Sequence, residues 1–480
     1  MLRPLIRRPR RNSEPRSKER GFTMALVAMT IVAIISMAAL SIDIGTLYEA
    51  KAEAQRAADA AALTAARVIS ISGITGDPAN ATSSWQLTCG GTSSPATLAA
   101  ISVAQTNLVS GIAVPTANVT VNYGAGRAGG ASQDCSSLGR DFGVNPTVTV
   151  TLQSSTLPIF FARIFSLVGS RYSGTTVSAT ATAEVFNSSD SGTVASQMIP
   201  VQPRCVKPLI VANKDPGNGV NRFVHLGSGA IFNPGVKQLG KGVIGENFNL
   251  GADCKVGAAD CEPGPGDMRD NPPTYNGANY PNVLEYVPAL ISGTPVAVSS
   301  GSSCSLTAGF QSAVGGCDQN TVYACGTLNG AQADLTENPV NPSGFAGDTS
   351  SAVQCLINSG TGQDALAGPL PPNPPNYPFQ IQAGAGSPLV QAKVVTANDI
   401  ITTSNSIVTL PIANFPVAGL AGTQPIVTIV GFLQVFINQV NPGGSLNVTV
   451  MNVVGCSDTA AGNPTVTGTS PVPIRLITPP

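Results

Sequence analysis

The residues with the greatest capacity for chemistry are few and scattered along the chain. Gly124-Ala125-Gly126-Arg127-Ala128-Gly129 has the spacing of a dinucleotide-binding loop, which must open a helix and precede an acidic residue by about 20 positions. Small residues without a helical pattern follow it, so a turn-forming loop is favoured. Gly227-Ser228-Gly229, beside the single histidine His225, lacks the Gly-x-Ser-x-Gly spacing of a hydrolase elbow. We therefore predict no catalytic and no cofactor-binding residue.

Ten cysteines offer a second kind of chemistry, either metal binding or disulfide formation. They are Cys89, Cys135, Cys205, Cys254, Cys261, Cys304, Cys317, Cys325, Cys355 and Cys456. No pair has Cys-x-x-Cys spacing and only one histidine is present, so a zinc site would need thiolates at irregular spacing. We therefore predict no metal site, and disulfides formed in an oxidising compartment. Cys254 with Cys261 and Cys317 with Cys325 could close small loops, but the sequence leaves the pairing open.

The N-terminus indicates where these cysteines are placed. Residues 1–20 carry eight Lys or Arg against two Glu, and residues 22–42 carry no charge. About 20 apolar residues in a helix cross a bilayer core of ~30 Å, and a basic flank marks the cytoplasmic side. We predict a cytoplasmic tail over 1–20, a transmembrane helix over 21–42 in contact with the lipid bilayer, and an extracytoplasmic location for the bulk of the chain.

Two other interpretations of the apolar segment involve cleavage. A secretory signal usually has a shorter apolar core of about 7–15 residues. A prepilin-like leader would be cut after Gly21, since Arg20-Gly21-Phe22 has the required order, but that signature normally has Glu where Leu26 stands. An uncleaved anchor is favoured.

Composition limits the remaining classes of function. Charged residues make up 11% of the 480 residues, well below the usual quarter. After residue 20 there are 17 basic and 24 acidic residues, a net charge of −7, which disfavours nucleic acid as a partner. No small-molecule substrate is evident. The 51 Gly and 38 Pro favour short strands and ordered loops, and the length suits two or three domains.

A helix is predicted to continue beyond the membrane over residues 43–72. It contains no Pro and is rich in Ala, Glu, Lys, Gln and Arg, which are good helix formers. A stripe of mostly small residues recurs at spacings of three and four, including Ala50, Ala54, Ala57 and Ala61. The stripe either faces the core of an amphipathic helix or docks another membrane-anchored helix, and both alternatives stay open.

The remainder predicts an α+β fold. We expect a small α+β domain over 73–186, a linker over 187–197 and a β-rich, disulfide-containing region over 198–480. The predicted helices cover 96–108 and 159–168. The predicted strands cover 119–123, 147–152, 176–185, 387–395, 406–412, 425–438 and 445–454. Asn441-Pro442-Gly443-Gly444 indicates a hairpin between the last two strands.

Three segments in this order resemble the TadG-like Flp pilus-assembly family of bacterial tight-adherence systems. The first runs from Arg20-Gly21 to Ala39-Leu40-Ser41-Ile42-Asp43-Ile44-Gly45-Thr46-Leu47-Tyr48. The second is Ala54-Gln55-Arg56-Ala57-Ala58-Asp59-Ala60-Ala61-Ala62-Leu63. The third runs from residues 148–152 through Leu157-Pro158-Ile159-Phe160-Phe161-Ala162 to Val177-Ser178-Ala179-Thr180-Ala181. The resemblance covers about 165 residues and implies a TadE/TadG-like N-terminal region.

The resemblance implies a non-catalytic inner-membrane protein that takes part in Flp/Tad pilus assembly or anchoring. Its expected partners are other pilin-like or pilus-assembly membrane proteins. Ser41 and Gly45 form a small-xxx-small pair that would let a partner helix approach closely, and with the alanine stripe they make the predicted docking set. Asp43 is expected to reach water where the helix leaves the membrane. Asp348-Thr349-Ser350-Ser351-Ala352 lacks the second Ser of the metal motif that some relatives carry.

Two further functions remain as alternatives. A pseudopilin-like structural subunit would be cleaved after Gly21 and enter the filament. An anchored binding or catalytic ectodomain would have its activity in residues 198–480.

Overall fold

The computed structural model describes most of the chain. The described residues are 19–478 except 77, 79–86, 127–129, 155–156, 158–175, 191–197, 218–221, 236–241, 253–281, 297–303, 305, 307–308, 327–329, 338–347, 368–378, 416–419 and 458–464. The basic tail, the predicted helix over 159–168, most of the predicted linker, and Cys254 and Cys261 therefore lie outside them.

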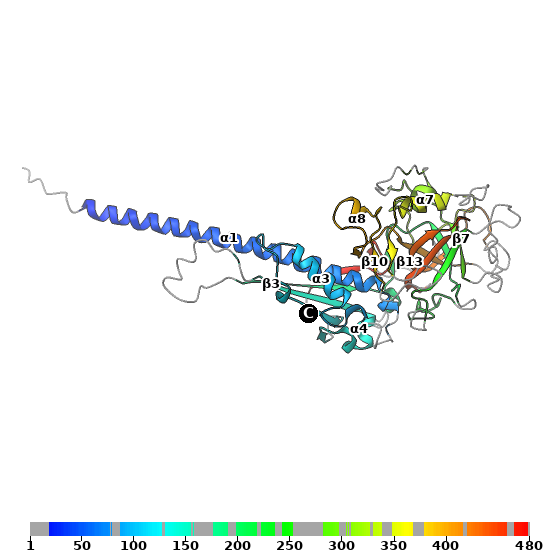
Figure 1. Ribbon diagram of the computed structural model, residues 1–480, viewed down its shortest axis with the longest axis horizontal. Coiled ribbons are helices and arrows are strands. Elements are labelled where there is room, and N and C mark those ends of the chain that lie inside the picture. Colours follow the sequence, from blue (N-terminus) through cyan, green and yellow to red (C-terminus); the bar gives the residue numbers. More distant parts are fainter. Residues whose placement is uncertain are drawn as a thin grey trace, which may run out of the picture.

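A single helix, α1 (Glu19–Ile71), runs from the N-terminal end into the body of the protein. Its 53 residues correspond to about 80 Å at 1.5 Å per residue, and it extends well beyond the folded part (Figure 1). It contains no Pro, and its two glycines, Gly21 and Gly45, are far apart. From Ala50 onward one face is buried, whereas the first half is largely exposed.

A five-stranded antiparallel sheet packs beneath the second half of α1. Its order is β16-β4-β3-β1-β2. The strands are β1 (Val119–Ala125), β2 (Ala131–Ser132), β3 (Pro146–Ser154), β4 (Val177–Val185) and β16 (Ile474–Ile477). α1 lies along β4 and β3, while α3 (Pro95–Thr106) lies beside α1. The small-residue stripe of α1 and the small residues of β4 allow this close approach.

The two faces of this sheet differ in character. Val148, Val150 and Leu152 alternate along β3 and are fully buried beneath the helices. On the other face the hydroxyls of Thr149 and Thr182 lie 2.9 Å apart across the strand pair. This alternation is what the Val/Thr pattern predicts for a half-buried strand.

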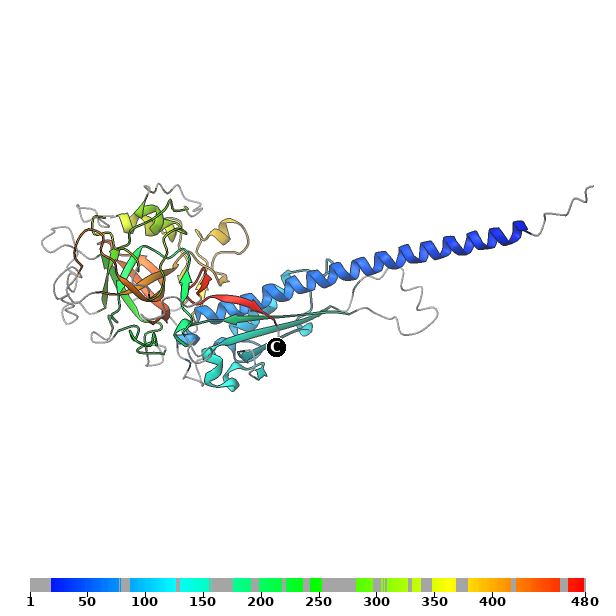
Figure 2. The ribbon, with the colours of Figure 1, turned by 180° about the vertical axis from the view of Figure 1, so that it is seen from behind.

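Strand β16 comes from the far end of the chain. It pairs antiparallel with β4, placing Arg475 opposite Glu184, and the view from behind shows the red strand beside the helix-covered sheet (Figure 2). Arg475 Nε donates to Glu184 Oε2 at 2.7 Å, and Asn145 Nδ2 donates to Glu184 Oε1 at 2.8 Å. The predicted boundary at residue 186 did not include this returning strand.

Beyond the sheet the chain forms a closed six-stranded barrel in the order β12-β13-β14-β7-β8-β6. Its strands are β6 (Leu209–Ala212), β7 (Asn247–Ala252), β8 (Val283–Pro288), β12 (Ile407–Asn414), β13 (Thr428–Val440) and β14 (Leu446–Gly455). Closure uses two parallel pairings, β12 with β6 and β7 with β8. The interior is aliphatic and aromatic, with Phe248, Leu410 and Phe436 essentially inaccessible.

Short elements surround these two layers. The short helices are η1 (Ile74–Gly76), η2 (Thr116–Asn118), η3 (Cys135–Leu138), α4 (Arg140–Val144), η5 (Ser188–Asp190), α6 (Phe310–Gly315), α7 (Asp348–Leu356) and α8 (Pro388–Gln391). The short strands are β5 (Val201–Pro203), β9 (Ala365–Leu366), β10 (Ile381–Gln382), β11 (Ile400–Ile401) and β15 (Val466–Gly468). β5 pairs with β15, and β9, β10 and β11 form a three-stranded sheet.

The end of α1 is joined directly to the barrel. Asn452 Nδ2, in β14, donates to the carbonyl of Ser70 at 2.5 Å. Gly73 follows with a φ of +78°, and a Cβ there would lie 2.4 Å from Ile244 Cγ2, so both the conformation and the contact require glycine. The C-terminal end of α1 and the barrel therefore meet through a buried hydrogen bond and close packing.

The mixture of helices and strands confirms the predicted α+β fold. Four disulfides are present among the described cysteines. Cys89 pairs with Cys135 beside the five-stranded sheet. The other pairs are Cys205–Cys317, Cys304–Cys355 and Cys325–Cys456. The small loop suggested for Cys317 with Cys325 is wrong, because each sulfur bonds a cysteine more than 100 residues away.

Most of the helices and strands predicted for the five-stranded sheet and the barrel are present, and one predicted strand is wrong. The strand predicted over 387–395 is instead the helical turn α8 followed by a further turn. Pro388 occupies the first helical position and supplies the reason, since its fixed φ suits a helix start. The hairpin at residues 441–444 is confirmed, with Gly444 N donating to Asn441 O at 2.9 Å.

Candidate functional site

The candidate site is the part of α1 that the rest of the protein leaves uncovered. Its most apolar stretch has a mean hydropathy of 2.5 with none of it buried, and it is long and apolar enough to cross a membrane. Thr30 and Ser36 direct their hydroxyls to the carbonyls of Leu26 and Val32, at 2.8 and 2.7 Å. These bonds satisfy the polar groups within the helix itself, as an apolar surrounding requires.

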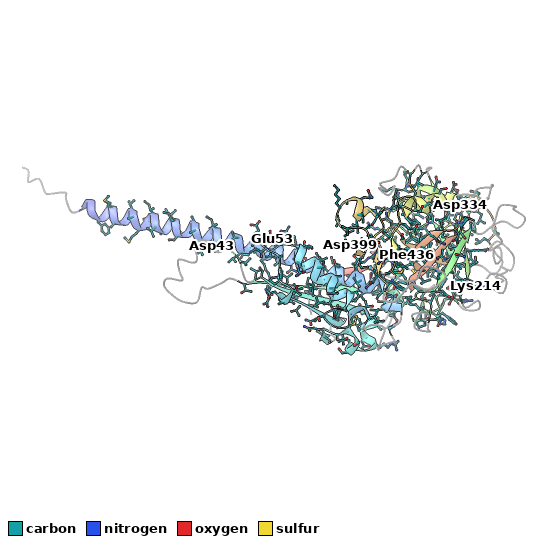
Figure 3. All side chains as sticks on the ribbon, viewed as in Figure 1. Asp43, Glu53, Lys214, Asp334, Asp399 and Phe436 are labelled. Carbon is teal, nitrogen blue, oxygen red and sulfur yellow. A yellow bond between two sulfur atoms is a disulfide. The ribbon has the colours of Figure 1, made fainter. Side chains whose placement is uncertain are left out.

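Where the exposed segment enters the protein, its faces have opposite environments. At about 100° per residue, Ser41, Gly45 and Tyr48 share one face, which is exposed. Tyr48 is 74% exposed, and nothing lies within 4 Å of a Cβ placed on Gly45. Asp43 lies nearly opposite, on the side that continues into the buried stripe, and is only 3% exposed. The expectation that Asp43 reaches water is therefore wrong. Figure 3 labels Asp43 on α1, on the N-terminal side of Glu53.

The alanines of the predicted docking set occupy the protein's own core. Ala50 is 1% exposed, and Ala54, Ala57 and Ala61 are fully buried where α1 packs on β4, β3 and α3. A partner helix on these four residues would have to displace the sheet. Ser41 and Gly45 lie on the opposite face, so the six residues do not form one surface.

Polar contacts fix the rotation of α1 about its own axis. Lys51 Nζ donates to the carbonyl of Ser178, and Gln55 Nε2 donates to the carbonyl of Thr180 at 3.1 Å. On another side, Glu53 Oε2 accepts a hydrogen bond from Ser110 N at 2.7 Å. Because both sides of the helix are held, the orientation of the Ser41 and Gly45 face is set by the folded domain.

Replacing Ala57 with leucine is expected to lower the free energy of unfolding by about 1–3 kcal/mol, because extra methylenes overfill a packed interface. Ala57 has no exposed surface. Urea unfolding of the full chain in detergent would measure the loss. Ala52→Leu, on the exposed face of the same helix, is the matched control and should change stability by less than about 0.5 kcal/mol. Equal effects of the two variants would contradict the packing.

The other motifs considered for chemistry have structural roles or no partners of the required kind. Gly124 and Ala125 end strand β1, and the next described element is the short strand β2 rather than a helix. The ring of His225 stacks on Phe232 with centroids 4.5 Å apart. Asp348 begins α7. Within the described part of the chain, no three His, Cys, Asp or Glu side chains gather as a metal site would require.

One comparison with known proteins gives a match, and it concerns this same helix. Residues 21–68 match the family model described as putative Flp pilus-assembly TadE/G-like. This segment, 48 of the chain's 480 residues, is similar to that family. The matched residues of this TadE/G-like segment begin at the apolar stretch and end three residues before α1 does. The chain matches no curated protein and no solved structure.

The TadE/G-like match supports a role related to the Flp/Tad pilus, and the structure shows what the matched residues do. The first half of the matched residues is the exposed apolar stretch. The second half is the alanine-rich part of α1 that packs on the five-stranded sheet. The motif around Ala57 and Ala61 is thereby explained by close helix–sheet packing.

Sequence reasoning missed two features near these elements. Tyr48 completes the exposed face, and its position one turn beyond Gly45 was a usable signal. Lys207, before β6, is 6% exposed, and its Nζ donates to the carbonyl of Gly316 at 2.5 Å. It lines a cavity of about 10 Å³ among apolar barrel side chains. No local pattern marks this lysine as buried, because its surroundings come from distant strands.

Proposed function

We propose that the protein is a single-pass component of a bacterial Flp/Tad pilus machinery, anchored in the inner membrane with its N-terminus in the cytoplasm. Its ectodomain is extracytoplasmic and acts without catalysis, in assembling or anchoring the pilus. The basic tail and the disulfides support this orientation.

The observation that carries the proposal is the continuity of α1. One helix without a Pro contains both the exposed apolar stretch and the buried strut of the sheet. Only about eight residues, or about 12 Å of helix, separate the end of the uncharged stretch at Ile42 from the first buried alanine, Ala50. The ectodomain would therefore stand directly on the membrane surface, with its orientation coupled to that of the span.

This arrangement directs one face of the helix toward partners. Ser41 and Gly45 are small and four residues apart, so a second helix can approach closely there. Tyr48 lies one turn further, at the depth where aromatic side chains favour the membrane–water interface. We propose that this Ser41, Gly45 and Tyr48 face contacts the membrane helix of a pilin-like or pilus-assembly protein.

Replacing both Ser41 and Gly45 with leucine should prevent a partner helix from approaching α1 closely, because the larger side chains fill the space left by the two small residues. Co-purification of pilin-like partners with the full-length protein is expected to fall at least tenfold, while membrane insertion persists because leucine favours lipid. Ser36→Leu is the matched control, since Ser36 is exposed on the opposite side of the same stretch. Unchanged recovery of partners with the double variant would reject the docking face.

N-terminal sequencing of the same purified full-length protein tests whether the anchor is left uncleaved. An N-terminal sequence beginning at Met1 is expected, and a mature end at Phe22 would instead support a processed, pilin-like subunit.

A further inference from the structure

We propose that a tight turn at residues 108–112 rests in the lipid headgroup layer of the same bilayer that α1 crosses, with Leu108 and Ile112 in contact with lipid. This inference rests on the membrane anchor of the proposed function and gives the ectodomain a second contact with that membrane. It does not involve the helix face proposed above, so the two contacts can be tested separately.

The turn follows α3 and is closed by its own backbone. Val109 N donates to Ile112 O at 2.9 Å, and Ile112 N donates to Val109 O at 3.1 Å. Ser110 and Gly111, between them, have φ values of +51° and +77°, as the two central residues of a type I′ turn require. Val109 is fully buried, so the core of the protein holds the turn in place.

The residues next to this turn are apolar and exposed. Leu108 is 50% exposed and Ile112 is 44% exposed, in a kind of segment where polar residues and glycine normally predominate. Residues 78–126, which include the turn, contain no Asp, Glu, Lys, Arg or His. A surface without ions can approach lipid without the cost of removing water from a charge. The turn therefore has the composition of a surface that tolerates contact with a bilayer.

A hydrogen bond to α1 sets the distance between the turn and the membrane. Ser110 N donates to Glu53 Oε2 at 2.7 Å, and Glu53 lies where α1 enters the folded body (Figure 3). Glu53 is about 16 Å of helix beyond Ile42, and helical side chains lean toward the N-terminus, which here is the membrane side. The headgroup layer extends about 5–8 Å beyond the hydrocarbon core. A tilt of about 20°, the average for a membrane span, brings the exposed side chains of the turn to that layer.

The turn is at the membrane end of the folded body and on a separate side of α1 from the proposed partner face. α3 packs beside α1 (Figure 1), and α1 becomes buried only from Ala50 onward. α3 therefore runs from the turn away from the membrane. Glu53 is about 140° around the helix axis from Tyr48, at 100° per residue. A partner helix and the bilayer can thus contact the protein at the same time.

The proposed contact depends on apolar burial rather than on charge. Leu108 and Ile112 gain free energy by leaving water, whereas residues 78–126 contain no Lys or Arg that could attract anionic headgroups. The contact should therefore be equally strong on zwitterionic and on anionic lipid. Together with the span, it would fix the tilt of the ectodomain over the membrane.

The first test measures how close the turn lies to the headgroups. The full chain is placed in phosphatidylcholine vesicles with Trp85→Phe, which removes its single tryptophan. Ile112→Trp then reports on the turn. Leu98→Trp is the matched control, because Leu98 is 51% exposed and lies about 12 Å of helix before the end of α3. Lipid with a nitroxide on its headgroup should quench Ile112→Trp emission at least twofold and leave Leu98→Trp nearly unchanged. Equal emission changes in the two variants would overturn the contact.

Flotation of the same vesicles in a density gradient measures the anchor separately. A chain that floats with the vesicles while Ile112→Trp stays unquenched would keep the proposed anchor and refute the contact of the turn. A chain that does not float would refute both.

The second test examines the chemistry of the contact in the Ile112→Trp background. Leu108→Asp should reduce the quenching at least twofold, because a carboxylate resists transfer toward lipid. Leu98→Asp is the control and should leave the quenching unchanged. Both leucines are half exposed, so both variants should fold, which thermal unfolding verifies. Equal effects of the two variants would refute the role of Leu108.

Salt and lipid charge complete this test. Quenching of Ile112→Trp should be the same in about 1 M salt, where the Debye length is about 3 Å, and in vesicles that contain phosphatidylglycerol. Loss of quenching at high salt would show that charges elsewhere in the chain hold the ectodomain to the membrane, and would overturn the apolar contact.

Discussion

Replacing Lys207 with methionine is expected to remove a pH-dependent loss of stability from the barrel. Burial lowers the pKa of Lys207 from 10.5 to about 7, because the ammonium loses hydration among apolar side chains. Between pH 7 and 10.5 the unfolded chain therefore binds one more proton than the folded protein. The free energy of unfolding consequently rises with pH in this window, by up to about 1.4 kcal/mol per pH unit.

The wild type should therefore gain about 3 kcal/mol between pH 6 and pH 9 from this group, whereas Lys207→Met should not. The variant is expected to be more stable than the wild type at pH 6, with the difference shrinking as pH increases. Urea unfolding at a series of pH values measures both. Lys393→Met, at an exposed position, is the control and should keep the wild-type slope. A slope that persists in Lys207→Met would show that the lysine is not the group responsible.

Removing the Cys325–Cys456 disulfide should produce the other large change. This bond joins residues 131 positions apart and anchors the end of β14. Replacing both cysteines with alanine frees the unfolded chain from that ring and should lower the free energy of unfolding by about 2–5 kcal/mol. Chemical unfolding of the full chain, compared with wild type in the absence of reductant, measures the loss.

The size of the ring provides an internal comparison. Cys304→Ala with Cys355→Ala opens a ring of only 51 positions, and chain entropy predicts a loss about 1 kcal/mol smaller. If the Cys325–Cys456 double variant unfolded like wild type, the barrel would not depend on this crosslink.

The elements predicted correctly from sequence are those whose pattern is local. The uncharged stretch and the alanine spacing were sufficient for α1, and alternation of Val with Thr was sufficient for β3. In both cases the signal lies within about ten residues of the element. The strand predicted over residues 387–395 is wrong because a local pattern was the only guide there. A short apolar segment has no period long enough to distinguish a strand from a helical turn.

The features that escaped prediction depend on pairings between distant residues. Barrel closure joins β6 to β12 about 200 positions later, and two of the disulfides join cysteines more than 100 positions apart. The six residues of the predicted docking set lie on two faces of α1, because a helical period alone does not reveal which face the rest of the chain covers. Ala57 satisfied the pattern of a contact surface and is a core residue, whereas Tyr48 was overlooked.

The pairing of β16 with β4 has a consequence for biosynthesis. One border of the five-stranded sheet stays open until residues 474–477 have been synthesised, long after the other strands of that sheet. A molecule whose synthesis stops early would leave one edge of β4 unpaired, and Glu184 would lack its ion pair with Arg475. The five-stranded sheet can therefore be completed only after the chain has been made as far as residue 477.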